Sequence, residues 1–319
     1  MSGTQKIDDN DEFWSVAMNG RDDYFLLQQE EEEDADDFDL TSCDIFERTI
    51  TTLATDTSDF RPLVLRLRQN NRDGCLSDVS GDIWDASLLL ASFLYGTNEG
   101  QQLCYDACFR MQSTQVDGGG ILELGSGLGL SGIAAAAAAA AVATLHKRHT
   151  KDADKEQLTS RVVLTDLNDK NIISLLRKNV ECNLSKIGED SDLSVTVQSC
   201  DWFNVASSRA NADNNSQPCV PTGTFNLIIG SALIYIPDHA VACAETVSRY
   251  LSKSNSSQAI IIQLPDRAGF DIFLRRCHEL ELLVSSRAIS EDVIMNVERR
   301  IVSATDYRIY FIKPRSDCH

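Results

Sequence analysis

A glycine-rich segment in the middle of the chain limits the possible folds more than any other feature. Residues 123–132 read Glu-Leu-Gly-Ser-Gly-Leu-Gly-Leu-Ser-Gly, between the short apolar run 121–124 and an alanine-rich stretch from about 130 to 147. The apolar run predicts a buried strand, and alanine is the best helix former. The glycines leave the main chain open to a ligand, and the helix N-terminus adds oriented N–H groups. We therefore expect a ligand site beyond the carboxyl end of this strand.

Strands and helices alternate after this segment. Apolar or β-branched runs predict strands at 161–165, 194–198, 225–230 and 259–264, helices at about 169–183, 238–252 and 268–280, and two closing strands near 281–287 and 305–313. Such an alternation indicates an α/β fold in which helices cover both faces of a mostly parallel sheet. The two closing strands are expected to form an antiparallel hairpin at the sheet edge.

The segments ahead of the glycine loop are less regular. Residues 62–68 alternate apolar and basic side chains, which predicts a half-buried strand in an N-terminal β extension, and residues 87–95 predict a buried helix. The polar stretch 96–119 is interpreted as a connector. Two further polar or charged stretches, 148–160 and 204–222, are interpreted as surface insertions.

The negative charge of the chain is concentrated at its N-terminus. The chain has 48 acidic and 29 basic residues, a net charge of -19, and residues 1–40 hold 14 of the acids beside only two bases. Self-repulsion predicts a disordered acidic tail over 1–40, followed by one folded domain over 41–319. An acidic balance argues against nucleic-acid binding, because neutralising phosphates requires a basic face.

Neither a membrane segment nor a metal site is expected. No basic region followed by an apolar run begins the sequence, and the longest apolar stretch, 133–145, is too short to span a bilayer. The ten cysteines include no CxxC pair, and Cys104 and Cys108 have no partners nearby that would complete a zinc site. Scattered thiols of this kind are typical of reduced cysteines in a cytosolic or nuclear protein.

Two cofactors compete for the glycine loop. Gly127-x-Gly129-x-x-Gly132 fits the dinucleotide fingerprint, but Glu123 would repel a pyrophosphate, and Asp166 follows Gly127 by 39 residues instead of roughly 20. S-adenosylmethionine fits better, because Glu123 would face its ammonium group and Asp166 would accept its ribose hydroxyls. An alternative for Asp166 is a helix N-cap.

Four ordered motifs accompany the loop and carry a resemblance to a known family. They are GDIWDASLLLASFL at 81–94, VVLTDLNDKNIISLLRKNVECN at 162–183, SCDWFN at 199–204 and FNLIIGSALIYIPD at 225–238. Together with ILELGSGLGLSGIAA at 121–135, they resemble the non-SET protein-lysine methyltransferases, a family of class I, seven-strand methyltransferases that use S-adenosylmethionine. The resemblance covers residues from about 60 to 315 and implies a Rossmann-like seven-stranded sheet.

The resemblance also implies roles for individual residues. The cofactor-binding residues would be Trp84, Glu123, Gly125, Gly127, Gly129, Asp166, Asp201, Trp202 and Ser231, and the catalytic residues Tyr235 and Asp238. Trp84 would wall the cofactor pocket, Asp201 and Trp202 would face the adenine, and Ser231 and Tyr235 would lie where donor meets substrate. Without the resemblance, Trp84 and Trp202 are better interpreted as core aromatics, and Tyr235 is equally well interpreted as a packing residue.

One position departs from the family pattern. The family has an acid three residues before the tyrosine, whereas this chain has Ala232 there; Asp238 is a candidate for the compensating carboxylate. The expected activity is S-adenosylmethionine-dependent methyl transfer to the ε-amino group of lysine in a protein substrate. The alternatives are a small-molecule N-methyltransferase, or a non-catalytic cofactor-binding scaffold whose acidic tail recruits basic partners. An NAD-dependent oxidoreductase ranks last.

Overall fold

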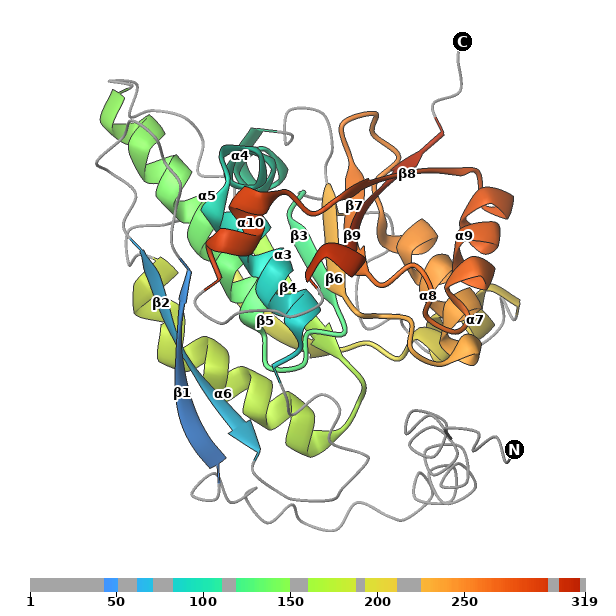
Figure 1. Ribbon diagram of the computed structural model, residues 1–319, viewed down its shortest axis with the longest axis horizontal. Coiled ribbons are helices and arrows are strands. Elements are labelled where there is room, and N and C mark those ends of the chain that lie inside the picture. Colours follow the sequence, from blue (N-terminus) through green and yellow to red (C-terminus); the bar gives the residue numbers. More distant parts are fainter. Residues whose placement is uncertain are drawn as a thin grey trace, which may run out of the picture.

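The computed structural model describes residues 43–50, 62–70, 83–110, 119–149, 160–187, 193–210, 225–297 and 304–315 (Figure 1). The predicted acidic tail over 1–40 lies outside these residues. Most of the predicted insertions at 148–160 and 204–222 also lie outside them.

A seven-stranded sheet forms the centre of the described structure, in the order β5-β4-β3-β6-β7-β9-β8. The parallel strands are β3 (Ile121–Leu124), β4 (Ser160–Asp166), β5 (Leu193–Ser199), β6 (Leu227–Ser231) and β7 (Gln258–Gln263). The closing strands β8 (Leu282–Ala288) and β9 (Arg308–Pro314) pair antiparallel. This arrangement confirms the predicted Rossmann-like sheet with its antiparallel C-terminal hairpin. The strand order reverses between β3 and β6, and ligands bind at such a point.

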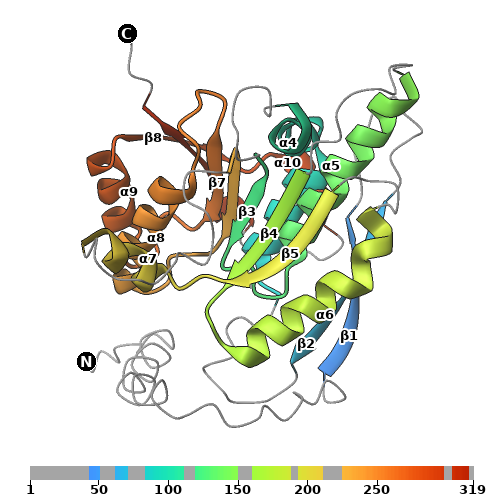
Figure 2. The ribbon, with the colours of Figure 1, turned by 180° about the vertical axis from the view of Figure 1, so that it is seen from behind.

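Helices cover both faces of the sheet (Figures 1 and 2). One face carries α3 (Asp85–Gly96), α5 (Leu130–His149) and α6 (Lys170–Ile187), and the other carries α7 (Trp202–Ala210), α8 (Pro237–Tyr250) and α9 (Phe270–Glu279). Alternate side chains of each strand point to opposite faces, so Ile121 joins the core cluster on the first face while Leu122 joins that on the second.

The alanine-rich helix α5 is the central helix of the first face. Residues 134–140 are all buried, because the small side chains let the helix approach the sheet and its neighbours α3 and α4 (Asn98–Tyr105) closely. A window of this helix, Leu130–Arg148, is long and apolar enough to cross a membrane, yet 72% of it is buried inside the protein. The apolar side chains of α5 therefore form part of the protein core.

The predicted connector over 96–119 is wrong for its first half. The structure has helix α4 (Asn98–Tyr105) followed by a π-helical turn, η4 (Asp106–Arg110). Thr97 begins α4, because its hydroxyl accepts a hydrogen bond from the Gly100 N–H (3.0 Å). A Cβ on Gly100 would lie 2.1 Å from the Phe93 carbonyl oxygen, so glycine lets α4 pack against α3. Helix α4 was not predicted because its many polar residues interrupt the hydrophobic period of a helix.

Two other short helices were not predicted. Helix α7 begins at Trp202, so it overlaps the start of the predicted insertion, and α10 (Glu291–Met295) lies between the two closing strands. A single turn, η6 (Ala304–Asp306), precedes β9, which begins three residues later than predicted.

The N-terminal extension is a two-stranded antiparallel hairpin of β1 (Cys43–Ile50) and β2 (Leu63–Asn70). Leu63, Leu65 and Leu67 are buried in the main core while Arg66 is exposed, which confirms the predicted half-buried strand. The hairpin lies beside α6, at the end of the molecule that holds β5 (Figure 2).

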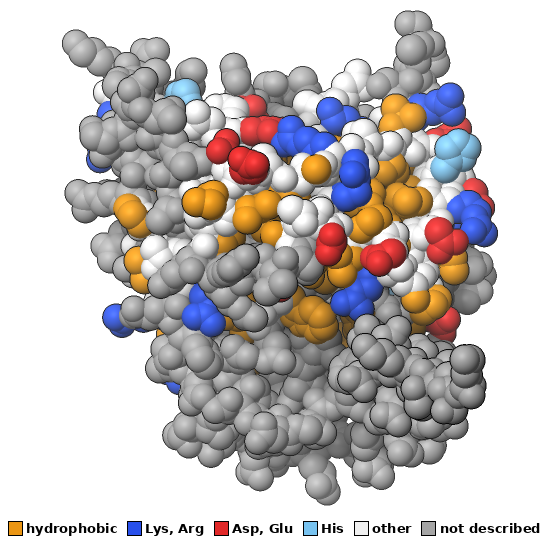
Figure 3. All heavy atoms as spheres, viewed as in Figure 1, with side chains coloured by type: hydrophobic (Ala, Val, Ile, Leu, Met, Phe, Trp, Pro, Cys, Tyr) orange, Lys and Arg blue, Asp and Glu red, His pale blue; other side chains and the backbone are white. Residues whose placement is uncertain are grey.

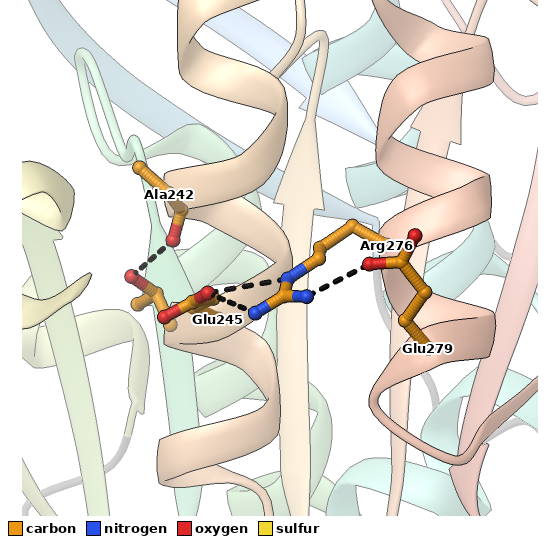
Figure 4. A network of polar contacts seen from close by, with 5 residues as sticks. Ala242, Glu245, Arg276 and Glu279 are labelled. Carbon is orange, nitrogen blue, oxygen red and sulfur yellow. Dashed lines mark hydrogen bonds and ion pairs between the residues drawn. The ribbon is translucent and has the colours of Figure 1, made fainter. Parts of the chain in front are cut away.

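Acidic and basic side chains are interspersed on the surface that Figure 3 shows. The described part of this face therefore shows no continuous acidic patch. Figure 4 shows a more organised group of charges between α8 and α9. Arg276 of α9 pairs with Glu245 of α8 and, at 2.7 Å, with Glu279 on its own helix. Glu245 also accepts from the Arg276 Nε–H at 3.2 Å.

We expect Arg276→Ala to lower the free energy of unfolding by about 1–2 kcal/mol, because it removes charge-assisted hydrogen bonds from a largely buried carboxylate. The Glu245 side chain is only 12% exposed. Arg275→Ala is the matched control: its pair with Asp271 is exposed on both sides (67% and 75%), so its loss should have little effect. Urea unfolding measures both variants, and equal effects would contradict the prediction.

Candidate cofactor-binding site

A pocket opens at the carboxyl ends of β3, β4 and β6, where the strand order reverses. Eight of the predicted site residues line it: Trp84, Gly125, Gly127, Asp166, Asp201, Trp202, Ser231 and Tyr235. The lining also includes residues that were not predicted: Ile83, Ser87, Ser126, Leu128, Leu130, Leu167, Cys200, Phe203, Ala232 and Leu233. Residues that lie as far apart in the sequence as Ile83 and Tyr235 therefore meet at one site.

The glycine loop presents its main chain to this pocket. Gly125 and Gly127 have φ values of 58° and 52°, a left-handed conformation that side chains make costly. A Cβ on Gly125 would lie 3.0 Å from Leu233 and 3.5 Å from the Trp202 ring, so it would fill the space beside that ring. Main-chain and side-chain hydrogen bonds between Ser126 and Thr165 (2.8 and 3.0 Å) fasten the loop to β4.

Gly129 has a different role from the other two glycines. It does not line the pocket, and its φ is 84°. A Cβ there would lie 2.6 Å from Leu176 of α6 and 3.1 Å from Leu164 of β4. Glycine at this position lets the loop pack against α6 and β4, so it supports the site from behind.

Asp166 ends β4 and connects it to the loop. Its Oδ2 accepts the Gly127 N–H at 2.7 Å, and its Oδ1 accepts the Leu167 N–H at 2.8 Å. The helix-cap interpretation is wrong, because Asp169 caps α6 by accepting the N–H groups of Asn171 and Ile172. Each carboxylate oxygen has more than one acceptor site, so Asp166 can also receive two hydroxyl groups from the pocket.

Glu123 lies beneath the loop and not in the pocket lining. Its side chain is buried, and burial raises the pKa of the carboxyl group to about 8. Ser126, Ser131 and the Gly132 N–H partly offset this by stabilising the charged form, while nearby Asp166 adds to the rise. Among the residues that the structure describes, none forms a hydrogen bond with the Glu123 Oε2 atom. Glu123 therefore lies behind the loop, and its contact with a cofactor ammonium group stays a prediction.

Asp201 and Trp202 form the start of α7. Asp201 caps that helix, since its Oδ1 accepts the Phe203 N–H (2.9 Å) and its Oδ2 accepts from the Asn204 amide (2.8 Å). Trp202 and Trp84 are both half-buried and both line the pocket, so neither is a fully enclosed core aromatic. The cap gives Asp201 a structural function in addition to its place in the lining.

The other side of the pocket is formed by the turn after β6. Ala232 has a φ of 51°, and among the described residues it shares a positive φ outside glycine only with Glu281. Its N–H donates to the Ile262 carbonyl at 2.9 Å. The Gln263 side chain holds the next part of the turn, accepting the Ile234 N–H (3.2 Å) and donating to the Ile234 carbonyl (2.9 Å). These bonds place Tyr235 at the pocket.

Sequence reasoning missed two residues beside Tyr235. The His239 ring lies edge-to-face with Tyr235, Phe203 and Trp202, at centroid distances of 5.1, 5.6 and 6.0 Å. Phe203 lines the pocket with 48% of its surface exposed. Phe203 lies within the SCDWFN motif, but only its Asp-Trp pair was given a role, and His239 directly follows the motif at 225–238.

Asp238 does not line the pocket. It is exposed in the first turn of α8, where a negative charge is favourable to the helix dipole. No group of three or more His, Cys, Asp or Glu side chains that could hold a metal occurs among the described residues.

The fold and the pocket define a class I methyltransferase that depends on S-adenosylmethionine. The family described as "Lysine methyltransferase" matches residues 61–276, which is more than half of the chain. The chain belongs to this family. No curated protein matches the sequence.

Solved structures of several methyltransferases are similar to this chain. A methyltransferase from Pyrococcus furiosus is 16% identical, with a TM-score of 0.34, covering 61% of this chain and 76% of its own. Geranyl diphosphate C-methyltransferase from Streptomyces coelicolor is 10% identical, with a TM-score of 0.34 and coverages of 70% and 80%. Phosphoethanolamine N-methyltransferase 2 from Haemonchus contortus is 11% identical, with a TM-score of 0.38 and coverages of 93% and 74%.

The pocket fits S-adenosylmethionine on its own geometry. The bare main chain at Gly125 and Gly127 leaves room for the methionine part, and the Asp166 carboxylate stands at the strand end where a ribose would lie. The Trp202 ring supplies an apolar wall for an adenine.

We expect Gly127→Arg to weaken binding of S-adenosylhomocysteine at least tenfold, about 1.4 kcal/mol, because the side chain would occupy the pocket and strain a left-handed residue. Calorimetry measures the affinity. Ser256→Arg is the control, since Ser256 is exposed and lies at the opposite, amino-terminal end of β7. Unchanged affinity in a folded Gly127→Arg protein would contradict this placement of the cofactor.

The buried Glu123 should make stability depend on pH. The unfolded chain releases this proton near the ordinary value of 4.5, while the folded protein holds it until about 8. The folded state therefore binds more protons between these values, and the free energy of unfolding falls as the pH rises through them. Glu123→Gln should remove this fall, which is at most about 1.4 kcal/mol per pH unit. Urea unfolding without cofactor tests it; parallel pH profiles would contradict it.

Proposed function

We propose that this protein transfers a methyl group from S-adenosylmethionine to the ε-amino group of a lysine in a protein substrate. The observation that carries the proposal is a single pocket in which the cofactor side, at the glycine loop, adjoins a second side at Tyr235. Membership of the lysine methyltransferase family supports the choice of acceptor.

On the cofactor side, each residue acts through contacts that the geometry allows. Gly125 and Gly127 expose their main chain, Asp166 accepts the ribose hydroxyls, and Trp202 covers the adenine. Trp84, Asp201 and Ser231 complete the walls. Glu123 and Gly129 support the loop from beneath.

On the acceptor side, the residues receive and orient an amine. Bound S-adenosylmethionine supplies an electrophilic methyl group on a sulfonium: the new N–C bond forms as the S–C bond breaks, and the electron pair remains on sulfur. A lysine has an ordinary pKa of about 10.4 and must lose its proton before attack. Desolvation beside Leu233 and the Tyr235 ring lowers that pKa, and water carries the proton away.

Because residue 232 is alanine, no carboxylate at this position can hold the incoming amine. The carboxylates of the pocket lining, Asp166 and Asp201, both belong to the cofactor side, and Asp238 is not in the lining. Aromatic rings then remain to attract the ammonium before its proton is lost. We assign this role to Tyr235, with the exposed Phe203 beside it, through cation–π contact with the ring. The Tyr235 hydroxyl then orients the amine by hydrogen bonding. Positioning and exclusion of water supply most of the catalysis.

The acidic N-terminal segment is proposed to recruit the substrate. Its 14 acidic residues would attract a basic, lysine-rich target over a long range, and salt would weaken this attraction. The cytosol or nucleus, where reduced thiols persist, is the compartment that fits the scattered cysteines.

Transfer of tritiated methyl groups to lysate proteins tests the proposal. We expect the wild type to label a protein, and acid hydrolysis to recover the label as methyl-lysine. Tyr235→Phe should reduce transfer about tenfold, a loss of about 1.4 kcal/mol of transition-state stabilisation, because the hydroxyl no longer orients the amine. Its affinity for S-adenosylhomocysteine should not change.

Tyr105→Phe is the matched control, since Tyr105 stacks on His146 (4.6 Å) and is not in the pocket lining. Label found only in small molecules would overturn the protein substrate. Intact binding of S-adenosylhomocysteine with no transfer to any fraction would favour the non-catalytic scaffold, which the absence of an acid at Ala232 makes the strongest rival.

A further inference from the structure

Two buried asparagines of α6 take the place of a neighbouring strand for β2. The Asn179 side chain accepts the Arg68 N–H (2.7 Å) and donates to the Arg68 carbonyl (3.1 Å). The Asn183 side chain does the same for Arg66, at 2.9 and 2.7 Å. Both asparagine residues have no exposed surface.

The spacing of the two amides matches the repeat of the strand. Four residues of an α-helix advance about 6.0 Å. Two residues of an antiparallel strand advance about 6.8 Å. Alternate residues of a strand direct both their N–H and C=O groups to the same edge, so Arg66 and Arg68 present these groups to α6 while their neighbours pair with β1. A pair of amides four apart on the helix therefore satisfies this edge of β2.

The two asparagines differ in their remaining hydrogen bond. Asn179 Nδ2 also donates to the Leu128 carbonyl at 3.1 Å, whereas Asn183 Nδ2 donates to the carbonyl of Asn179 within the same helix at 2.7 Å. Leu128 lines the pocket and lies directly between Gly127 and Gly129. One side chain thus bonds the N-terminal hairpin and the glycine loop together.

The remaining contacts of the loop show why this bond matters. The front of the loop is held from β4, through Ser126 and Thr165 and through the Asp166 carboxylate. The Leu128 carbonyl is on the other side, where Asn179 reaches it from α6. Without this donor, a buried carbonyl would be left unsatisfied beside the pocket, and the loop would have to turn it toward water.

We propose that Asn179 is a positioning residue of the cofactor site, and that through it the N-terminal hairpin stabilises the conformation of the glycine loop that binds S-adenosylmethionine. The hairpin does not line the pocket, so it acts on cofactor affinity by restricting the loop. The inference concerns cofactor binding alone and is independent of the identity of the methyl acceptor.

The matched variants Asn179→Ser and Asn183→Ser test the proposal. Both remove a buried amide that holds one residue of β2, so both should lower the midpoint of urea unfolding. We expect only Asn179→Ser to raise the Kd for S-adenosylhomocysteine, about fivefold to tenfold, against less than twofold for Asn183→Ser. In a transfer assay, KM for S-adenosylmethionine should rise for Asn179→Ser, and kcat at saturating cofactor should stay close to that of the wild type. Equal changes in Kd for the two variants would overturn the proposal.

A second measurement needs no variant. Coupling between two sites is reciprocal, so a ligand that fixes the loop must also stabilise the hairpin. Saturating S-adenosylhomocysteine should therefore slow hydrogen exchange at the Arg66 and Arg68 amides of the wild type at least threefold. The amides of β8, at the opposite edge of the sheet, serve as the internal control. The proposal would be overturned if the ligand did not slow exchange at the hairpin amides. It would also be overturned if the ligand slowed exchange at the β8 amides by as large a factor.

Discussion

The hydrogen bond from the Gly127 N–H to the Asp166 carboxylate is the interaction on which the site depends. It joins the turn after β3 to the end of β4, beside the point between β3 and β6 where the strand order reverses. Left-handed glycines make the turn possible, and the Ser126–Thr165 bonds continue the strand pairing into it. A ligand that approaches this edge therefore meets a main chain already held in place, and pays little for ordering it.

Buried side-chain amides hold the segments that regular secondary structure leaves without partners. Asn183 and Asn179 complete the free edge of β2, and Gln263 holds both main-chain groups of Ile234 in the turn that carries Tyr235. An amide suits this task because it donates and accepts as a peptide group does, without bringing a charge into the core. The two sides of the pocket are thus stabilised by the same chemistry from different elements.

The sequence predicted most of the sheet, because its strands are apolar runs that alternate with helices, and it predicted the glycine loop, because glycine is required there by conformation. It did not predict α4, where buried polar residues such as Gln101 break the hydrophobic period. Residues at strand ends, such as Asp166, could be assigned to the site from their position alone. The burial of Glu123 beneath the loop and the contact of His239 with three rings could not be predicted, because both depend on tertiary packing.

The left-handed backbone at Ala232 has a consequence for the acceptor side. Aspartate and asparagine adopt this conformation more readily than alanine does, so the turn is shaped for a residue that it does not contain. A carboxylate could return at this position without any movement of the main chain, because the bond to Ile262 fixes the same geometry for either residue. Under the proposed function, the charge of the acceptor side can therefore be changed at position 232 without a change in the shape of the turn.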